Sequence, residues 1–225
     1  MIAKAKKMGE RDKRRIFLID DHPVLRDGLR RLLDAESDLE VCGEAESARK
    51  AFDSIKATSP ALAIIDISLP GVSGIELVKG LKARFPTLQI LMLSMHDEVL
   101  YAERALRAGA KGYVMKQAPT EHLLAAVRRV LTGEIYVSEA LSAQLLGNLV
   151  KKKTQPGPLL EILSDRELEI LHLLGKGFTT ADVAKQLGIS SKTVESHRGN
   201  LRRKLNLKSG SELLRFAIAN AEGGV

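Results

Sequence analysis

Short apolar runs alternate with longer amphipathic segments between residues 16 and 132, which is the pattern of a parallel sheet with crossover helices. The apolar runs are Ile16–Ile19, Glu40–Ala45, Leu62–Asp66, Gln89–Ser94 and Gly112–Met115, and the helical patterns lie near 23–35, 47–57, 73–85, 98–108 and 119–132. The runs lack strict two-residue alternation, as expected of strands that are covered on both faces. The sequence therefore predicts a doubly wound (βα)5 domain over residues 14–133.

A different pattern follows. The segment Val150–Pro158 combines three lysines with two prolines and a glycine, which cannot continue a helix or strand, and it marks a linker over residues 134–158. Four helical patterns come after it, at 164–175, 180–187, 191–205 and 209–221. Ser164, with Glu167 three residues later, matches a capping box that starts the first of them. We therefore expect a small all-α domain over residues 159–225.

The charge is divided unevenly between these regions. The chain of 225 residues carries a net charge of +7, split as +5 over residues 1–15, −3 over 16–150 and +5 over 151–225. A basic C-terminal third indicates a polyanionic partner, whereas the basic start is a flexible leader or a nucleic-acid arm. A single cysteine excludes an internal disulfide, and no run of roughly 18 apolar residues is present. We expect a cytoplasmic protein without membrane contact.

Acidic residues close the first and third predicted strands, at Asp20, Asp21 and Asp66. In an open parallel sheet, ligands collect beyond the carboxyl ends of the strands, so these carboxylates are expected to converge and to bind Mg²⁺. Ser94 ends the fourth strand and Lys116 follows the fifth, a pairing that suits a group with several anionic oxygens. Asp66 is the candidate nucleophile toward a phosphoryl group.

These residues resemble the receiver domains of two-component response regulators. The resemblance covers Arg14–Gly133 and rests on the motifs at 19–22, 65–71, Ser94 and 112–116. It implies a sensor histidine kinase as partner, Asp66 as phosphoacceptor, and Mg²⁺ held by Asp20, Asp21, Asp66 and the Ser68 carbonyl. It also implies that Ser94 and Lys116 sense the phosphoryl group and that Tyr113 is an aromatic switch. Gln117-Ala118-Pro119 stands where relatives carry a proline directly after the lysine.

The C-terminal domain contains the outline of a helix-turn-helix. A helix over 180–187, a turn at 188–190 and a second helix over 191–205 form it. On the second helix, Val194, Leu201 and Leu205 share one side, and the opposite side is free to enter a major groove of double-stranded DNA. The candidate DNA-contacting residues are Lys192, Thr193, Glu195, Ser196, Arg198, Arg202 and Arg203.

This domain resembles the LuxR-type DNA-binding domain, and the whole chain is similar to the NarL/FixJ class of response regulators over about nine-tenths of its length. Gly199 and Lys208-Ser209-Gly210 depart from commoner patterns of that class. The resemblance implies a homodimer on DNA. On the last helix, Leu213, Leu214, Ala217 and Ile218 are spaced to pack against their own domain or against a second copy.

The combined prediction is a transcription regulator, not an enzyme, in which phosphorylation of Asp66 weakens contacts that mask the recognition helix. One alternative is a phosphatase with an aspartyl nucleophile, although such enzymes usually carry a second acid two residues later, where Ser68 stands. Another alternative is a receiver that serves as an unphosphorylated dimerisation module.

Overall fold

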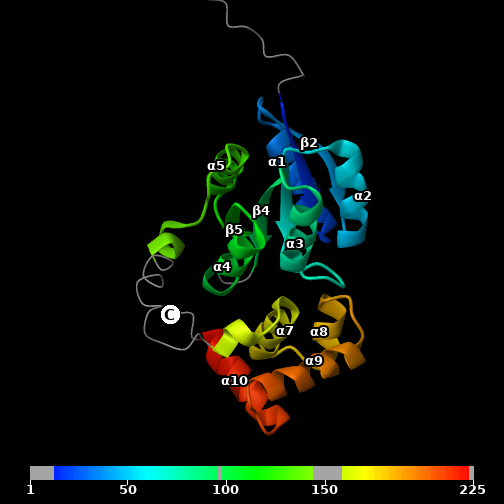
Figure 1. Ribbon diagram of the computed structural model, residues 1–225, viewed down its shortest axis with the longest axis vertical. Helices are drawn as coiled ribbons and strands as arrows, with labels where there is room; N and C mark the ends of the chain where they lie inside the picture. The colour runs from blue at the N-terminus through cyan, green and yellow to red at the C-terminus, as the bar shows by residue number, and fades with distance from the viewer. Residues whose placement is uncertain (1–12, 96–97, 144–158, 223–225) are drawn as a thin grey trace, which may run out of the picture.

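The computed structural model describes residues 13–95, 98–143 and 159–222, which form an α/β unit above a helical unit (Figure 1). The α/β unit contains β1 (Arg14–Ile19), α1 (Pro23–Asp34), β2 (Leu39–Ala45), α2 (Ala48–Thr58), β3 (Leu62–Asp66), α3 (Gly74–Arg84), β4 (Gln89–Ser94), α4 (Glu98–Ala108), β5 (Gly112–Met115) and α5 (Thr120–Leu131). The helical unit contains the 3-10 helix η2 (Leu159–Ile162), α7 (Asp165–Gly175), α8 (Thr180–Gln186), α9 (Ser191–Lys204) and α10 (Gly210–Glu222). The predicted fold class is confirmed, with element ends within about two residues.

Two sequence predictions fall partly or wholly beyond these residues. The Pro/Gly linker segment at 150–158 and most of the basic leader lie outside the described residues. Within the described ranges, no helix is long and apolar enough to span a membrane.

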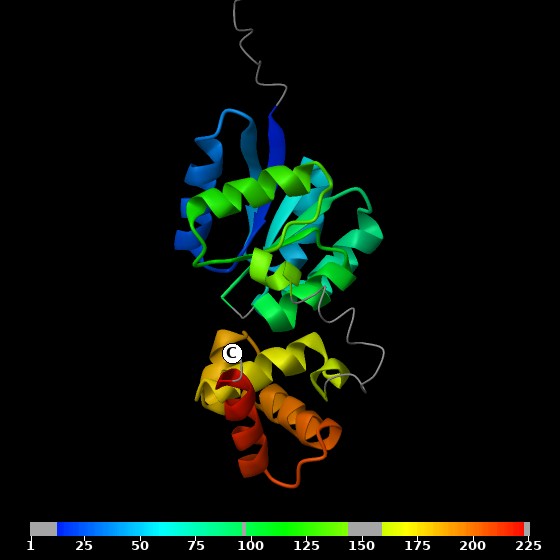
Figure 2. The ribbon, with the colours of Figure 1, turned by 90° about the vertical axis from the view of Figure 1, so that its left-hand side faces the viewer.

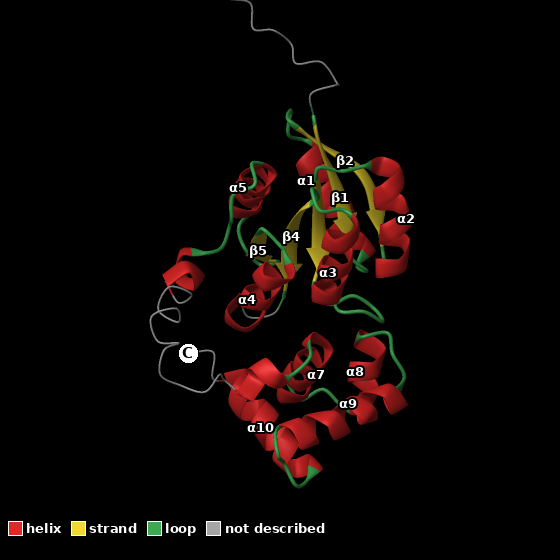
Figure 3. Ribbon diagram, in the orientation of Figure 1, coloured by secondary structure: helices red, strands yellow, loops and turns green. Residues whose placement is uncertain are grey.

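All five strands of the sheet are parallel and lie in the order β2-β1-β3-β4-β5 (Figure 3). From β1 the chain first moves to β2 on one side, and then it crosses back over β1 to β3 on the other side. The direction of the connections therefore reverses between β1 and β3. At such a reversal the following helices lie on opposite faces, and a crevice opens beyond the carboxyl ends of the two strands. Asp20 directly follows β1 and Asp66 is the last residue of β3, so both lie at this crevice.

Alternate strand residues supply two apolar layers. One layer joins Ile16, Leu18 and Ile64 of the strands to α1 and α5, and the other joins Phe17 and Ile65 to α2, α3 and α4. Both faces of the sheet are therefore covered, which explains why the strand sequences are continuously apolar. Figure 2 shows α5 lying across one face of the sheet.

The helical unit is organised by its helix starts. Ser164 and Glu167 form the predicted capping box at α7, and Thr179 and Asp182 form a second one at α8. Each box satisfies two backbone N–H groups that a helix start otherwise leaves without partners. The apolar core of this unit is continuous with the layer that packs between the sheet and helices α2, α3 and α4.

Candidate functional site

A compact cluster of acids and one lysine occupies the crevice at the carboxyl ends of β1, β3 and β5. The side chains of Asp20 and Asp66 are buried, each residue being 3% exposed. The Lys116 ammonium lies between them, 2.7 Å from Asp20 Oδ2 and 2.8 Å from Asp66 Oδ2. The structure thus brings together three residues that lie 46 to 96 positions apart in the sequence, as the strand ends predict.

The same crevice offers ligands for a cation. One ligand atom from each of Asp20, Asp21, His22 and Asp66 lies within 4.8 Å of the others. Carboxylate oxygens in a partly hydrated site are the donors that Mg²⁺ prefers, so the donor set fits that ion. Sequence reasoning missed His22, whose Nδ1 lies 2.9 Å from Asp21 Oδ1 and 3.3 Å from Asp20 Oδ1. Its position directly after Asp21 was the available signal.

Burial and charge both act on the titration of this cluster. Burial raises the pKa of Asp66, and the neighbouring Asp20 carboxylate raises it further, although Lys116 and the backbone amide of Ser68 act in the opposite direction. Burial by itself would lower the pKa of Lys116, but Asp66 and Asp20 together raise it above its ordinary value. Two carboxylates therefore share one ammonium, and the site has an excess of negative charge that a divalent cation can neutralise.

The remaining residues of the predicted switch lie in the same sheet edge. Ser94 and Tyr113 are both 0% exposed, at the end of β4 and within β5. The backbone amide of Lys116 donates to the Ser94 carbonyl at 2.7 Å, which ties the two strand ends together. Pro119, displaced by two positions from where relatives carry it, is the N-cap residue of α5.

The loop between β3 and α3, residues 67–73, carries the Ser68 carbonyl and closes tightly on Asp66. The Gly74 amide donates to the Ile67 carbonyl at 2.7 Å, and Ser73 caps α3 by accepting from the Ile75 amide. Gly71 has φ of +82°, a conformation that glycine adopts without strain. Pro70 and Gly71 lie at a bend where the sequence indicates a turn, and the Gly71 amide donates to the Leu187 carbonyl of the helical unit at 3.0 Å.

Helix α9 presents the predicted recognition surface. Val194, Leu201 and Leu205 are buried at 0%, 0% and 6% exposure. Of the seven candidate DNA-contacting residues, the exposed ones are Lys192, Thr193, Glu195, Ser196, Arg202 and Arg203. Arg198 is half-buried and donates to Glu195 Oε1 at 2.8 Å and to Thr180 Oγ1 at 2.6 Å. Arg198 and Glu195 therefore pair with each other on the exposed side of α9.

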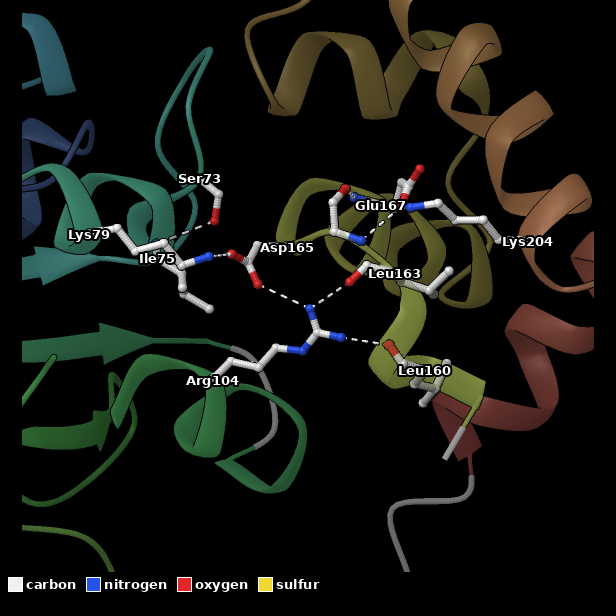
Figure 4. A network of polar contacts seen from close by, with 10 residues as sticks. Ser73, Ile75, Lys79, Arg104, Leu160, Leu163, Asp165, Glu167 and Lys204 are labelled. Carbon is white, nitrogen blue, oxygen red and sulfur yellow. Dashed lines mark hydrogen bonds and ion pairs between the residues drawn. The ribbon is translucent and has the colours of Figure 1, made fainter. Parts of the chain in front are cut away.

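A polar network joins the two units (Figure 4). Arg104 of α4 donates to Asp165 Oδ1 at 3.0 Å and to the carbonyls of Leu163 and Leu160 at 2.9 and 2.5 Å. Lys79 of α3 pairs with the other oxygen of Asp165 at 2.9 Å. The sheet domain thus holds η2 and the start of α7, two elements to which the sequence pattern assigned no such contact.

These contacts leave the candidate base-contacting side chains uncovered. The sheet domain packs against the start of α7 and the turn after α8, whereas Lys192, Thr193, Glu195 and Ser196 at the start of α9 stay exposed. Helix α9 lies farther from the sheet domain than α7 does (Figure 1). Masking of the recognition helix by the docked sheet domain, which contacts Gly188 three residues before α9, stays a prediction.

Comparisons with known proteins divide the chain at the same place. Residues 16–128 match the response regulator receiver domain, and residues 161–217 match the luxR family of bacterial regulatory proteins. The oxygen regulatory protein NreC of Staphylococcus haemolyticus is 40% identical over 209 residues, which are 91% of this chain and 96% of that protein. NreC of Staphylococcus carnosus is 38% identical with the same coverage.

The chain also resembles solved structures, over most of its length in one case and over a smaller part in another. RcsB from Salmonella enterica serovar Typhimurium, bound to promoter rprA in the presence of phosphomimetic BeF3⁻, is 27% identical with a TM-score of 0.62, covering 92% of this chain and 98% of that chain. A LuxR-family two-component response regulator from Aurantimonas sp. SI85-9A1 is 33% identical with a TM-score of 0.58, covering 61% of this chain and 99% of that chain.

Proposed function

Because this chain belongs to the two-component response regulators and joins a receiver domain to a luxR-family DNA-binding domain, we propose that a sensor histidine kinase phosphorylates it at Asp66. The family consists of DNA-binding transcription regulators rather than enzymes, which removes the phosphatase alternative. We assign the receiver to residues 14–133, the linker to 134–158 and the DNA-binding domain to 159–225. We also propose that the protein is cytoplasmic, because its two proposed partners are a kinase and DNA.

The observation that carries the proposal is the crevice in which Asp66 faces Lys116 and Asp20. In the transfer, an Asp66 carboxylate oxygen forms a bond to phosphorus while the phosphorus–nitrogen bond of the kinase's phosphohistidine breaks, and the imidazole leaves with that electron pair. Lys116, 2.8 Å from Asp66, offsets the charge on the moving group. Positioning and charge, rather than a separate base, supply the catalysis.

A cation completes this arrangement. Asp20, Asp21, Asp66 and the Ser68 carbonyl would hold Mg²⁺, and His22 stands beside them. When bound, Mg²⁺ neutralises charge on the phosphoryl oxygens and draws the carboxylates together. Ser94 and Tyr113 then respond to the new group from β4 and β5, where both are already buried.

The assignment of Asp66 is tested by labelling with a small acyl phosphate donor in the presence of Mg²⁺. Wild type is expected to gain one phosphoryl group that is lost in Asp66→Asn and retained in the control Asp53→Asn, which changes an exposed acid on α2. Equal labelling of wild type and Asp66→Asn would refute the assignment. Wild type that gains no phosphoryl group but still binds DNA as a dimer would favour the unphosphorylated dimerisation module instead.

The second half of the proposal concerns DNA. We assign α9 to the major groove, with Lys192, Thr193, Glu195, Ser196 and Arg198 toward the bases. Arg202 and Arg203, exposed farther along the helix, contact phosphates. Footprints with and without phosphodonor are expected to protect the same site at lower protein concentration after phosphorylation.

We further propose a homodimer on DNA. On α10, Leu213 and Ala217 are each 1% exposed against their own domain, whereas Leu214 and Ile218 stay 42% and 38% exposed. One side of α10 therefore packs within its own domain, and we assign the other, exposed side to a second copy of the chain. One solved RcsB structure contains two dimers bound to two parallel DNAs, which supports a paired arrangement. Leu214→Ser is expected to weaken dimer formation in sedimentation without lowering thermal stability.

A further inference from the structure

The DNA-binding domain contacts the loop that begins immediately after Asp66. Arg166 of α7 donates from Nη2 to the Leu69 carbonyl at 3.4 Å and to the Leu187 carbonyl at 3.1 Å. The Gly71 amide donates to the same Leu187 carbonyl at 3.0 Å. The loop is therefore tied to the second domain through its own backbone, at positions three to five residues beyond the phosphoacceptor.

Close packing accompanies these hydrogen bonds. A Cβ atom built on Gly188, in the turn after α8, would lie 2.7 Å from Pro70 Cβ, which is tighter than real Cβ contacts. Only glycine, here with φ of +60°, lets the turn approach the loop this closely. The two domains are therefore closely packed at this contact.

A buried ion pair lies behind the loop. Arg166 Nη1 pairs with Glu169 Oε2 at 2.6 Å, and the two residues are only 6% and 1% exposed. The Ser73 hydroxyl, at the far end of the loop, also hydrogen-bonds the Glu169 carboxylate. Burial raises the pKa of Glu169 to about 7 against the effect of Arg166, and Asp66 is among the charges that raise it. Glu169 and Asp66 therefore repel each other when both are ionised.

We propose that Arg166 and Glu169, two side chains of the DNA-binding domain, are positioning residues for phosphoryl acceptance: docked on loop 67–73, they slow the reaction at Asp66. This inference rests on the proposed function of Asp66. Arg166 restrains the loop that carries the Ser68 carbonyl, and the Glu169 carboxylate opposes added negative charge.

The sign follows from the charges. The ionised Asp66 carboxylate carries one negative charge, and its acyl phosphate carries between one and two at neutral pH and about two in mildly alkaline solution. Phosphorylation therefore adds negative charge near Glu169 and disfavours docking. Because coupling between two equilibria is reciprocal, docking disfavours the phosphorylated form by the same factor. Release of the helical unit is then driven from the phosphoacceptor loop itself.

The test uses the full chain, acetyl phosphate and Mg²⁺ at pH 8, where Glu169 is ionised. An Asp66 oxygen forms a bond to phosphorus, the bond from phosphorus to the acyl oxygen breaks, and acetate leaves with the electron pair. Glu169→Gln keeps the shape and removes a charge that opposes the negative charge developing at Asp66 in the transition state, so its maximal labelling rate is expected to be about 3- to 10-fold above wild type, with the half-saturating donor concentration unchanged. Arg166→Met, which frees the Leu69 carbonyl, is expected to be faster as well.

Two controls separate this effect from general loosening. Lys79→Met removes a half-exposed interdomain ion pair that does not touch the loop, and it should stay within about twofold of wild type because exposed pairs contribute little. Glu169→Asp keeps the charge and should also stay within about twofold. A Glu169→Gln rate equal to that of wild type, or equal to that of Glu169→Asp, would overturn the inference.

Hydrogen exchange supplies a second measurement. Amides of loop 67–73, including that of Gly71, should exchange faster in Arg166→Met than in wild type or Lys79→Met, whereas Glu169→Gln, which keeps the shape and the docked contact, should exchange as wild type does. Faster exchange with an unchanged labelling rate would show that the clamp exists but does not govern acceptance, which also overturns the inference. Wild-type protein that accepts no phosphoryl group at Asp66 would instead refute the proposed function.

Discussion

Gly74 is the position where the fold of the receiver and its chemistry depend most directly on one another. It is the first residue of α3, and its amide closes the loop onto the Ile67 carbonyl at 2.7 Å. A Cβ built there lies 2.8 Å from Ile67 Cα and closer still to the Asp66 carbonyl oxygen. Ordinary contacts begin at 3.4 Å, so Gly74→Ala must displace the backbone directly after the phosphoacceptor, at Ile67 Cα, by at least 0.6 Å (3.4 minus 2.8).

This displacement sets the expected magnitude. Overpacking against backbone costs about 1–3 kcal/mol, because no side chain can rotate away. With a urea m-value of about 2 kcal/mol/M, a loss of about 2 kcal/mol lowers the unfolding midpoint by about 1 M. A 1 Å misplacement of reacting groups can cost about 100-fold in rate, so labelling of Asp66 should fall at least tenfold.

Gly28→Ala is the matched control. Gly28 lies in the middle of α1 with nothing within 4 Å of a built Cβ. Alanine is favoured over glycine inside helices by about 1 kcal/mol, so this variant should be slightly more stable than wild type and should label normally. If Gly74→Ala unfolded at the wild-type urea concentration and accepted phosphoryl groups at the wild-type rate, the argument that the loop is closed by contact would be wrong.

Three further predictions test charge in the structure. Lys116→Met leaves Asp20 and Asp66 facing each other in a buried site, so the free energy of unfolding of the receiver should fall by about 3–5 kcal/mol without Mg²⁺. Added Mg²⁺ should restore part of this loss, which thermal melts with and without the ion would measure. Equal melts of variant and wild type would contradict this. The pKa of Glu169 is raised from 4.5 to about 7, so the docked form holds a proton that separated domains release between those values. The free energy of docking is then most favourable below pH 4.5 and weakens as the pH rises through 7, by at most about 1.4 kcal/mol per pH unit. Small-angle scattering should show that the domains of wild type separate as the pH rises, whereas Glu169→Gln should show no comparable pH dependence. Arg203→Ala should weaken binding equally for specific and unrelated DNA and reduce the slope of log K against log salt by about 0.9, measured by fluorescence polarisation; an unchanged slope would remove Arg203 from the phosphate contacts.

The crevice was predictable from the sequence because its geometry follows from topology. Residues at the ends of parallel strands meet at one edge whatever the details of packing, so Asp20, Asp66 and Lys116 were expected to lie together. In the structure the carboxylates of Asp20 and Asp66 both lie within 2.8 Å of the Lys116 ammonium. The position of His22 depends instead on one turn. Its backbone amide donates to Asp20 Oδ1 at 2.8 Å, which directs the ring back to the acids, and periodicity carries no information about such a turn.

The domain interface could not be predicted for a different reason. Charged residues in an amphipathic helix usually face solvent, and on that rule Asp165, Arg166 and Glu169 belong to the outer face of α7. In the structure all three are buried, because this outward side of α7 packs against the sheet domain. The available signal was the density of charge in the first turns of α7, which exceeds what the Ser164–Glu167 capping box requires.

The polarity of this interface has a physical consequence for regulation. Apolar side chains in place of the Arg166–Glu169 pair would avoid the cost of removing two charges from water, and such replacements often stabilise a buried contact by about 1–4 kcal/mol. The interface instead uses charged groups, with Arg104, Lys79 and Asp165 at its other end. The polar contribution to its stability is therefore a small difference between desolvation and pairing. A change of about one charge at Asp66 can reverse a balance of that size, whereas it would hardly affect an interface held by apolar area alone.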